Sequence, residues 1–246
     1  MSNSNIINWS ICQEISDEIL AEGIERLKTV KKLSFDEIRS HEYGNYLISN
    51  AGQPYYTGEA KNLFKRLKQH SKEKTSTFYK NYLKKLNSRY PILEIDDFGI
   101  QILETRIGRK EIEEFGTVNL PTSLNKFQKG KRKLFSGNPN KGIWNDVQDN
   151  ANQLLAEGEA ALFAVNPVPW YDADVPNNAG LYYVENNKNG LVYIGESSNI
   201  NDRYETHSET TYFSALRRHL GTDILGFELQ IRKGKKRYFS DSEDVH

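Results

Sequence analysis

The sequence predicts an α/β protein of the α+β type, built from two small units that each carry a small mixed or antiparallel β-sheet flanked by helices. The main observation is an internal repeat, because Gly58 to His70 recurs in the same register as Gly195 to His207. Each copy follows a tyrosine-rich hairpin. In the first copy, the expected order of two strands, two helices, a strand and a helix cannot form an all-parallel sheet. One small unit is therefore used twice, behind an N-terminal helical arm.

The charge of the chain is balanced overall but uneven along it. The 246 residues leave room for one large domain or two small ones, and the formal net charge is zero. From Lys61 to Arg89, ten Lys or Arg residues stand against a single acid, and a second basic run spans 126–133. Because local charge decides which partners bind, the basic stretches indicate a nucleic-acid partner. One lysine run by itself would equally well be a solvated helix face.

Cysteine and hydropathy restrict the class of protein. Cys12 is the single cysteine, which excludes an intrachain disulfide and a thiolate metal cluster. The N-terminus lacks the charged and apolar regions of a signal peptide, and no apolar run approaches the length of about 18 residues that a membrane span needs. We therefore expect a cytoplasmic protein that is neither secreted nor membrane-bound.

Residues 1–40 form the predicted N-terminal arm, with two helices over 8–40. Two serines have the spacing of a capping box: Ser10 with Gln13, and Ser34 with Glu37. Apolar residues recur at helical intervals between Ile11 and Val30, which gives a stripe that must pack against something. We expect this arm either to support the rest of the chain or to serve as a dimerisation element. The sequence therefore leaves open whether the protein is a homodimer.

Residues 41–135 form the first unit, called repeat one. Its expected elements are a hairpin over 43–58, helices over about 60–72 and 77–87, a strand over 98–103 and a helix over 108–118. On the first of these helices, Leu63 and Leu67 face inward. Arg66 and His70 are four residues apart and share one helix face.

A proline- and asparagine-rich, acidic linker is expected over 136–178, before a second unit at 179–246, called repeat two. The linker should hold one helix over 144–157 and a short apolar run over 160–165, as an extra strand or docking piece. The elements expected in repeat two are a hairpin over 181–194, a helix from near Asn199, a helix over 212–220 and a third strand over 227–231. The third helix has no counterpart in the given sequence, so we expect repeat two to be incomplete.

The residues at matched positions carry a resemblance to a known family. Both copies have Gly-x-Tyr, about ten residues, Tyr-x-Gly and then Arg-x-x-x-His. In repeat one these are Gly44, Tyr46, Tyr56, Gly58, Arg66 and His70, and in repeat two Gly180, Tyr182, Tyr193, Gly195, Arg203 and His207. This pattern resembles the GIY-YIG nuclease family, over roughly Tyr43 to Lys133 and again from Ala179 onward.

Two further marks of that family have counterparts in repeat one. Glu113 stands on the expected third helix, and Asn125 follows Pro121 at family-like spacing. Glu111 and Glu114 lie close enough to leave the choice among the three glutamates open. The resemblance implies Glu113 as the ligand of a Mg²⁺ or Mn²⁺ ion. It also implies Asn125 as a site residue.

The resemblance implies a metal-dependent endonuclease that hydrolyses DNA, with repeat one as the more complete catalytic unit. It implies Tyr46 as the base acting on water, with Tyr56 and His70 orienting phosphate or relaying the proton. The matching site residues of repeat two are Tyr182, Tyr193, Arg203 and His207.

The same residue types suit phosphodiester hydrolysis on chemical grounds. Such a reaction needs an activated water, a cation against the charge building on the phosphoryl oxygens, and help for the leaving oxygen. Arg66 offers a planar fork of donors to phosphate, and Glu113 can anchor one hard divalent ion. Tyrosine titrates near pH 10, so a base role for Tyr46 requires neighbouring cations or a transient tyrosinate. Alone, a strand tyrosine would usually be a packing residue.

DNA binding is expected through basic residues of repeat one: Lys61, Lys65, Lys68, Lys80, Lys84, Lys85, Lys131 and Arg132. RNA as the substrate stays open. The alternative function is a non-catalytic nucleic-acid-binding or interaction module built from degenerate repeats. Repeat one also departs from the family pattern at Asn45 and Thr57, for which we expect looser packing of the hairpin.

Overall fold

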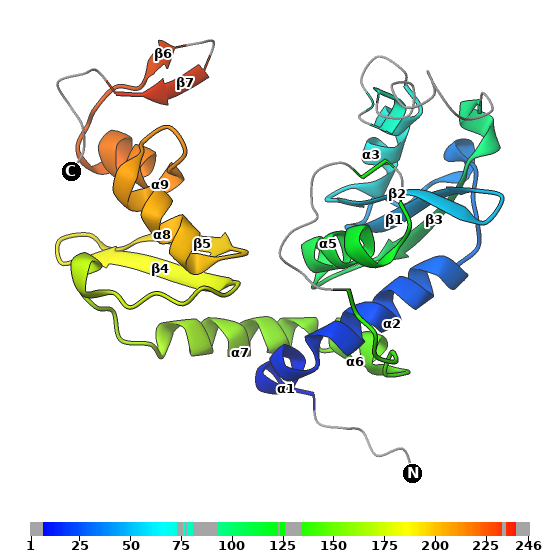
Figure 1. The fold of residues 1–246 in the computed structure, drawn as a ribbon, viewed down its shortest axis with the longest axis horizontal. Helices are drawn as coiled ribbons and strands as arrows, with labels where there is room; N and C mark the ends of the chain where they lie inside the picture. The colour runs from blue at the N-terminus through cyan, green and yellow to red at the C-terminus, as the bar shows by residue number, and fades with distance from the viewer. Residues whose placement is uncertain are drawn as a thin grey trace. The chain divides into compact units, whose positions relative to one another are not determined.

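The computed structural model describes residues 7–72, 76, 78–80, 93–122, 124–125, 134–232 and 235–239. The chain divides into two compact units, Met1–Gly158 and Glu159–His246. These boundaries differ from those expected from the sequence. The N-terminal arm and the whole of the helix expected over 144–157 belong to the first unit (Figure 1).

The sheet of the first unit is antiparallel, with strand order β2-β1-β3, which confirms the predicted fold class. Its strands are β1 (Gly44–Asn50), β2 (Gln53–Ala60) and β3 (Gly99–Glu104). The chain turns between β1 and β2 through Ala51 and Gly52, with φ of 46° and 82°. Two central residues with positive φ match the right-handed twist of the flanking strands. The β1–β2 hairpin therefore closes tightly. β1 also pairs with β3, which makes β1 the central strand.

One face of this sheet packs against α3 (Leu63–His70). Alternate residues of a strand point to opposite faces. The face toward α3 accordingly carries Tyr46, Ile48 and Tyr56, which are buried with Leu63 and Leu67 of α3. The helix begins after Asn62, whose Oδ1 accepts a hydrogen bond from the backbone N–H of Lys65 at 2.8 Å. This arrangement brings the polar side chains of α3 over the two tyrosines.

The opposite face of the sheet is covered by α2 (Ser16–Thr29) and α5 (Arg109–Asn119). Behind them, α1 (Trp9–Glu14) and α6 (Ile143–Asp149) pack against α2, and α7 (Ala151–Phe163) adds Leu154 to the same core. Their buried core includes Ile19, Leu20, Ile24, Leu27, Ile112, Phe115, Trp144, Val147 and Leu154. Each such side chain contributes about 1.5–3 kcal/mol on burial. The apolar stripe of the arm thus packs within its own unit as a support.

Glu22 explains why α6 docks on the arm. Its carboxylate is buried and accepts hydrogen bonds from the backbone N–H groups of Gly142, at 2.7 Å, and Trp144, at 2.6 Å. Arg26 donates to the same carboxylate from Nε at 3.1 Å. A buried carboxylate is tolerated when hydrogen bonds satisfy it, and here they come from the first turn of α6. The part of the expected linker that forms α6 therefore belongs to the core of the first unit.

Several local expectations about the helices were wrong. The single helix expected over 144–157 is two helices, α6 and α7, which meet at Asn150. The apolar run expected as a strand over 160–165 mostly continues α7, to Phe163. The N-cap of α1 is Asn8 rather than Ser10, because Asn8 Oδ1 accepts from Ile11 N at 2.9 Å. Ser34 and Glu37 do form a capping box, but only for a single 3-10 turn, η1 (Phe35–Glu37).

The expected looseness of the hairpin is also contradicted. Asn45 and Thr57 are both fully buried. Asn45 Nδ2 donates to the backbone oxygen of Arg109 at 2.8 Å, and Thr57 Oγ1 donates to that of Tyr46 at 3.3 Å. Backbone acceptors satisfy these donors, so polar residues are accommodated between the sheet and α5. The helix expected over 77–87 lies outside the described residues, apart from a helical stretch at 78–80.

The second unit repeats the hairpin and the helix that follows. Its described elements are η3 (Trp170–Asp172), β4 (Gly180–Asn186), β5 (Gly190–Ser197), α8 (Ile200–Glu209), α9 (Ala215–His219), η4 (Leu220–Ile224), β6 (Gln230–Arg232) and β7 (Lys235–Tyr238). Tyr182 pairs with Gly195 as Tyr46 pairs with Gly58. Asn199 caps α8 as Asn62 caps α3. The two units therefore share a hairpin–helix motif in one register.

The prediction that a third strand joins the β4–β5 sheet of repeat two is wrong. β6 pairs with β7 in a separate two-stranded sheet, and not with β4. β7 follows β6 almost immediately in sequence, so the local hairpin closes a far shorter loop than pairing with β4 would. The helix expected over 212–220 starts later, because residues 211–213 form a turn and Ser214 caps α9. Within the described residues, no helix combines the length and apolar character required to cross a bilayer.

Candidate active site

Two tyrosines on adjacent strands form the floor of the candidate site in repeat one. Tyr46 of β1 and Tyr56 of β2 stack with ring centroids 6.1 Å apart. Opposite Tyr46 stands Gly58, where an added Cβ would lie 2.3 Å from the Tyr46 hydroxyl oxygen. The corresponding distance from Gly195 to the Tyr182 hydroxyl is also 2.3 Å. The glycine of each Tyr-x-Gly motif thus leaves the space that the other tyrosine occupies.

The helix α3 supplies the polar partners of Tyr46. The Tyr46 hydroxyl lies 2.7 Å from Nε2 of His70, and both side chains are fully buried. Arg66, one turn earlier on the same helix face, donates from Nε to the Tyr46 oxygen at 3.3 Å. The His70 ring also packs edge-on against Tyr56, with centroids 5.4 Å apart. The predicted Tyr, Arg and His residues therefore come together in one cluster.

A serine that the sequence reasoning missed completes this cluster. Ser76 Oγ lies 3.1 Å from His70 Nδ1, and it accepts a hydrogen bond from the backbone N–H of Tyr79 at 3.0 Å. Ser214 holds the same position in repeat two, 2.7 Å from His207 Nδ1. The signal was present in the repeat, because a serine follows each histidine by six or seven residues.

Burial and charge set the protonation states of the pair. Burial raises the pKa of Tyr46 well above its ordinary value of 10, with a further increase from Tyr56 and an opposing effect of Arg66. Burial and then the charge of Arg66 lower the pKa of His70 to about 3. At neutral pH, Tyr46 is therefore protonated and His70 is neutral. A neutral imidazole has one acceptor nitrogen, which can receive a tyrosine proton.

Glu113 of α5 lies at the edge of this cluster. Burial and the nearby charge of Glu59 raise its pKa to about 7, against the lowering effects of Arg66 and Arg109. Glu59 is itself ion-paired with Arg109. The charge of Glu113 acts on both Tyr46 and Tyr56. Glu113 is half-buried, whereas Glu111 is exposed in the first turn of α5.

Asn125 holds a strand in place. Its Oδ1 accepts from the backbone N–H of Thr57 at 2.9 Å, and its Nδ2 donates to the backbone oxygen of Thr57 at 2.8 Å. Leu124 N also donates to Tyr55 O at 2.9 Å. The Asn125 amide thus imitates a neighbouring strand along the outer edge of β2. This fixes the backbone on both sides of Tyr56, which is a positioning role.

The expected DNA-binding residues are only partly described. Lys61, Lys65, Lys68 and Lys80 are exposed, three of them at or on α3. Lys84, Lys85, Lys131 and Arg132 lie outside the described residues. The exposed face of α3 is accordingly basic beside the Tyr–His pair.

Repeat two reproduces the cluster with different surroundings. Tyr182 OH lies 2.7 Å from His207 Nε2, and the Tyr182 and Tyr193 rings are 6.1 Å apart. Burial and then Tyr193 raise the pKa of Tyr182 to about 12. Burial, Arg203 and Arg218 lower the pKa of His207 to about 4. Within the described residues Arg203 Nε is buried without a hydrogen-bond partner.

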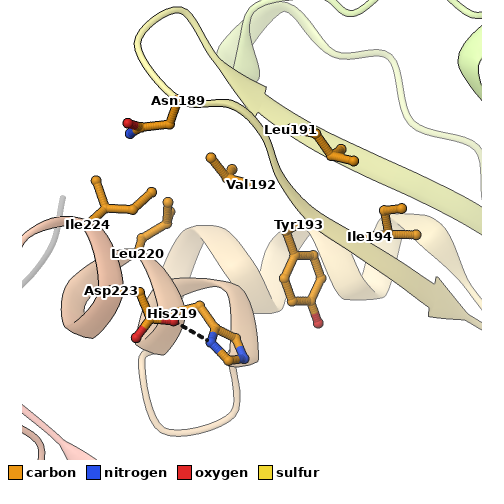
Figure 2. Close-up of a pocket in the computed structure, with 9 residues that line it drawn as sticks. All are labelled: Asn189, Leu191, Val192, Tyr193, Ile194, His219, Leu220, Asp223 and Ile224. Atoms are coloured by element: carbon orange, nitrogen blue, oxygen red, sulfur yellow. Dashed lines mark hydrogen bonds and ion pairs between the residues drawn. The ribbon is translucent and has the colours of Figure 1, made fainter.

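A hollow of about 420 Å³ lies beside Tyr193 in the second unit (Figure 2). Apolar side chains of β5 and η4 form most of its wall, and His219 Nδ1 lies 3.0 Å from Asp223 Oδ2 at its rim. Its lining residues are Asn189, Leu191, Val192, Tyr193, Ile194, His219, Leu220, Asp223 and Ile224. Among the predicted site residues only Tyr193 belongs to this set.

The comparison with protein families agrees with the geometry. The family model of the GIY-YIG catalytic domain matches residues 42–115 and 178–238, which cover the two hairpin–helix motifs. No curated protein and no solved structure matches the chain. Within the described parts of the chain no group of three or more His, Cys, Asp or Glu residues is placed to hold a metal.

Proposed function

The chain belongs to the GIY-YIG family of nucleases, and we propose that it is a metal-dependent endonuclease that hydrolyses DNA phosphodiester bonds in repeat one. The observation that carries the proposal is the buried hydrogen bond of 2.7 Å between Tyr46 and His70. Arg66 lies on one side of this pair, and the charge of Glu113 acts from another. A base, a phosphate ligand and a metal-binding carboxylate are thus close together.

In the proposed reaction Tyr46 accepts a proton from the attacking water while its own hydroxyl proton passes to His70 Nε2. The water oxygen forms a bond to phosphorus, and the bond from phosphorus to the leaving sugar oxygen breaks. That oxygen takes a proton from solvent, and the His70 imidazolium later returns its proton to Tyr46 while the proton already on Tyr46 passes to solvent. The transfer from Tyr46 to His70 runs over a hydrogen bond that is already formed, as general acid–base catalysis requires.

Arg66 links substrate binding to this proton transfer. Its charge is one cause of the low pKa of His70, which makes the imidazole a weak base in the free protein. A phosphate anion bound to Arg66 would neutralise that charge and raise the pKa of His70. The guanidinium would also stabilise the charge that builds on the phosphoryl oxygens. His70 therefore becomes a better proton acceptor when substrate is present.

Glu113 fits a single divalent cation. Its pKa of about 7 reflects a carboxylate that is costly to keep charged, and a cation would relieve that cost. Mg²⁺ is commonly held by one or two carboxylates together with waters and phosphate oxygens, so one protein ligand is sufficient. When bound, Mg²⁺ or Mn²⁺ would neutralise charge on the phosphoryl group during hydrolysis.

A plasmid assay tests the proposal. Supercoiled DNA and Mg²⁺ should be converted to nicked or linear DNA by the wild-type chain, and a chelator should stop the reaction. Glu113→Gln removes the carboxylate charge, and Glu111→Gln is the matched control on the exposed side of α5. A parallel reaction with RNA identifies the substrate class. Cleavage that persists in chelator, or that Glu113→Gln leaves unchanged, would refute the metal assignment.

For repeat two, one observation favours nucleic-acid binding without catalysis. Arg203 Nε is a buried donor that has no acceptor within the described residues. A phosphate oxygen would satisfy it, and the Tyr182 and Tyr193 hydroxyls lie on the same face. Arg203→Ala should then weaken DNA binding while cleavage chemistry continues. Unchanged affinity for DNA in this variant would remove repeat two from the binding surface.

A further inference from the structure

Each repeat holds its histidine between a tyrosine and a serine. In repeat one, His70 Nε2 lies 2.7 Å from the Tyr46 hydroxyl, and Nδ1 lies 3.1 Å from Ser76 Oγ. In repeat two, both contacts of His207, to Tyr182 and to Ser214, measure 2.7 Å. The serines are as buried as the histidines. Both ring nitrogens are therefore engaged away from water.

The serine has a second bond that is the same in both repeats. Ser76 Oγ accepts from the backbone N–H of Tyr79 at 3.0 Å, and Ser214 Oγ accepts from that of Arg217, also at 3.0 Å. Each serine is thus an N-cap, held by the residue three positions later. The loop between histidine and serine differs by one residue between the repeats, yet the contact is retained. The contact therefore does not depend on one particular loop.

The proposed reaction sets the direction of the hydrogen bonds. Arg66 donates to the Tyr46 oxygen, and the transfer of a proton from Tyr46 to His70 requires this hydroxyl to donate its own proton to Nε2. His70 Nε2 then accepts. A neutral imidazole carries its proton on one nitrogen only, which must be Nδ1. Ser76 Oγ is the acceptor within reach of Nδ1 in the described residues.

We propose that Ser76 is a positioning residue that holds His70 in the tautomer with its proton on Nδ1, and that Ser214 does the same for His207. The proposal deepens the proposed function, because only this tautomer leaves Nε2 free to receive the proton of Tyr46. In the other tautomer, Nε2 would carry a proton and could not accept the one from Tyr46. The serine is thus needed for the proton transfer without touching the substrate.

The tautomer is measured directly in the free protein, without DNA or metal. Nitrogen-15 NMR of labelled histidines should show Nδ1–H for His70 and His207 in the wild type, with assignments from His70→Gln and His207→Gln. Ser76→Gly removes the hydroxyl, while glycine remains an acceptable N-cap. In this variant the His70 signals should move toward the Nε2–H pattern, and those of His207 should stay unchanged. Ser76→Thr restores a hydroxyl and should restore the wild-type pattern.

Cleavage provides the second measurement. Ser76→Gly should lower the plasmid cleavage rate by about tenfold or more, within the contribution usual for general acid–base catalysis, and Ser76→Thr should recover it. Ser34→Gly changes another N-cap serine, away from the site, and is the matched control. An Nε2–H tautomer in the wild type, or Ser76→Gly with unchanged His70 signals, would overturn the proposal. A wild type that does not cleave DNA refutes the proposed function, and the NMR result still decides the role of the serine.

Discussion

The two repeats contain the same buried contacts but differ in what surrounds them. In repeat one Tyr46 is 0% exposed, and Asn45 and Thr57, on the other side of the hairpin, are also 0% exposed under α5. In repeat two the residues that correspond to these two, Leu181 and Ile194, are each 50% exposed. The hairpin and the next helix therefore form the Tyr–His–Ser contacts without a covered second face.

The electrostatic surroundings differ as well. Glu113 acts on the tyrosines of repeat one, whereas Arg203 and Arg218 act on His207 in repeat two. The helix faces also differ, because Lys65 and Lys68 of α3 correspond to Asp202 and Glu205 of α8. One local motif therefore stands in two different electrostatic settings. We propose a hydrolytic site for the first setting and capture of a single phosphate for the second.

The largest expected effect is that of Glu113. Glu113→Gln should abolish Mg²⁺-dependent cleavage, a loss of about a hundredfold or more, because the metal loses its protein ligand. DNA binding should be unchanged or slightly tighter, since a negative charge beside phosphate is removed. Plasmid cleavage and a binding titration at fixed salt measure the two quantities. A fully active Glu113→Gln protein would place the catalytic centre elsewhere.

The next effect compares the two arginines. Arg66→Ala should lose cleavage by about a hundredfold, the range usual for removing one electrostatic stabiliser, with a much smaller change in DNA affinity. Arg203→Ala should leave the cleavage rate nearly unchanged. Single-turnover rates at saturating protein separate chemistry from binding. Loss of cleavage in Arg203→Ala together with activity in Arg66→Ala would reverse the assignment of the repeats.

Substitution of Gly58 and of Gly195, the glycines of the two Tyr-x-Gly motifs, compares how tightly the two repeats are packed. Gly58→Ala would place a Cβ 2.3 Å from the Tyr46 hydroxyl oxygen, and Tyr46 has no exposed side toward which it can move. We expect a loss of about 1–3 kcal/mol in the free energy of unfolding, as for overpacked cores. Gly195→Ala should cost less, because Tyr182 is partly exposed and can shift. Urea unfolding of both variants measures the difference, and equal costs would contradict it.

The pH dependence of stability isolates the carboxylate of repeat one. Folding raises the pKa of Glu113 from an ordinary 4.5 to about 7, so in that window the native state binds more protons than the unfolded state. Stability should therefore fall as pH rises from 4.5 to 7. His70 opposes this trend, because its pKa is lowered on folding. The free energy of unfolding is measured in chelator for the wild type and for Glu113→Gln, and the difference between the two isolates the contribution of Glu113. If this difference does not change with pH, the raised pKa of Glu113 is refuted.

The smallest expected effect concerns the charged helix faces. Lys65→Gln together with Lys68→Gln should lower the slope of log affinity against log salt by about 0.9 for each phosphate that the protein no longer neutralises. Asp202→Asn together with Glu205→Gln is the matched pair on α8 and should not reduce that slope. Affinities measured over a range of salt concentrations provide the test. An unaltered slope in the lysine variant would mean that α3 is only a solvated face.

Spacing and periodicity predicted the hairpins, the helices α3 and α8, and the helix face that Arg66 and His70 share. The family resemblance implied the grouping of Tyr46 with these two residues, which the fold brings together. Turn chemistry, helix caps and the i, i+4 rule act within about a dozen residues, so such patterns are readable without a fold. The repeat in the sequence also contained Ser76 and Ser214, although their role needed the geometry.

Only the tertiary structure decided the arrangements made by segments far apart in the chain. Glu22 binds the N-terminus of α6, Asn125 pairs with Thr57 in β2, and β6 pairs with β7 instead of β4. The effects of burial, Glu59 and Arg66 on the pKa of Glu113 belong here too. None of these contacts has a local signature, because each depends on which surfaces are buried and which polar groups must then be satisfied.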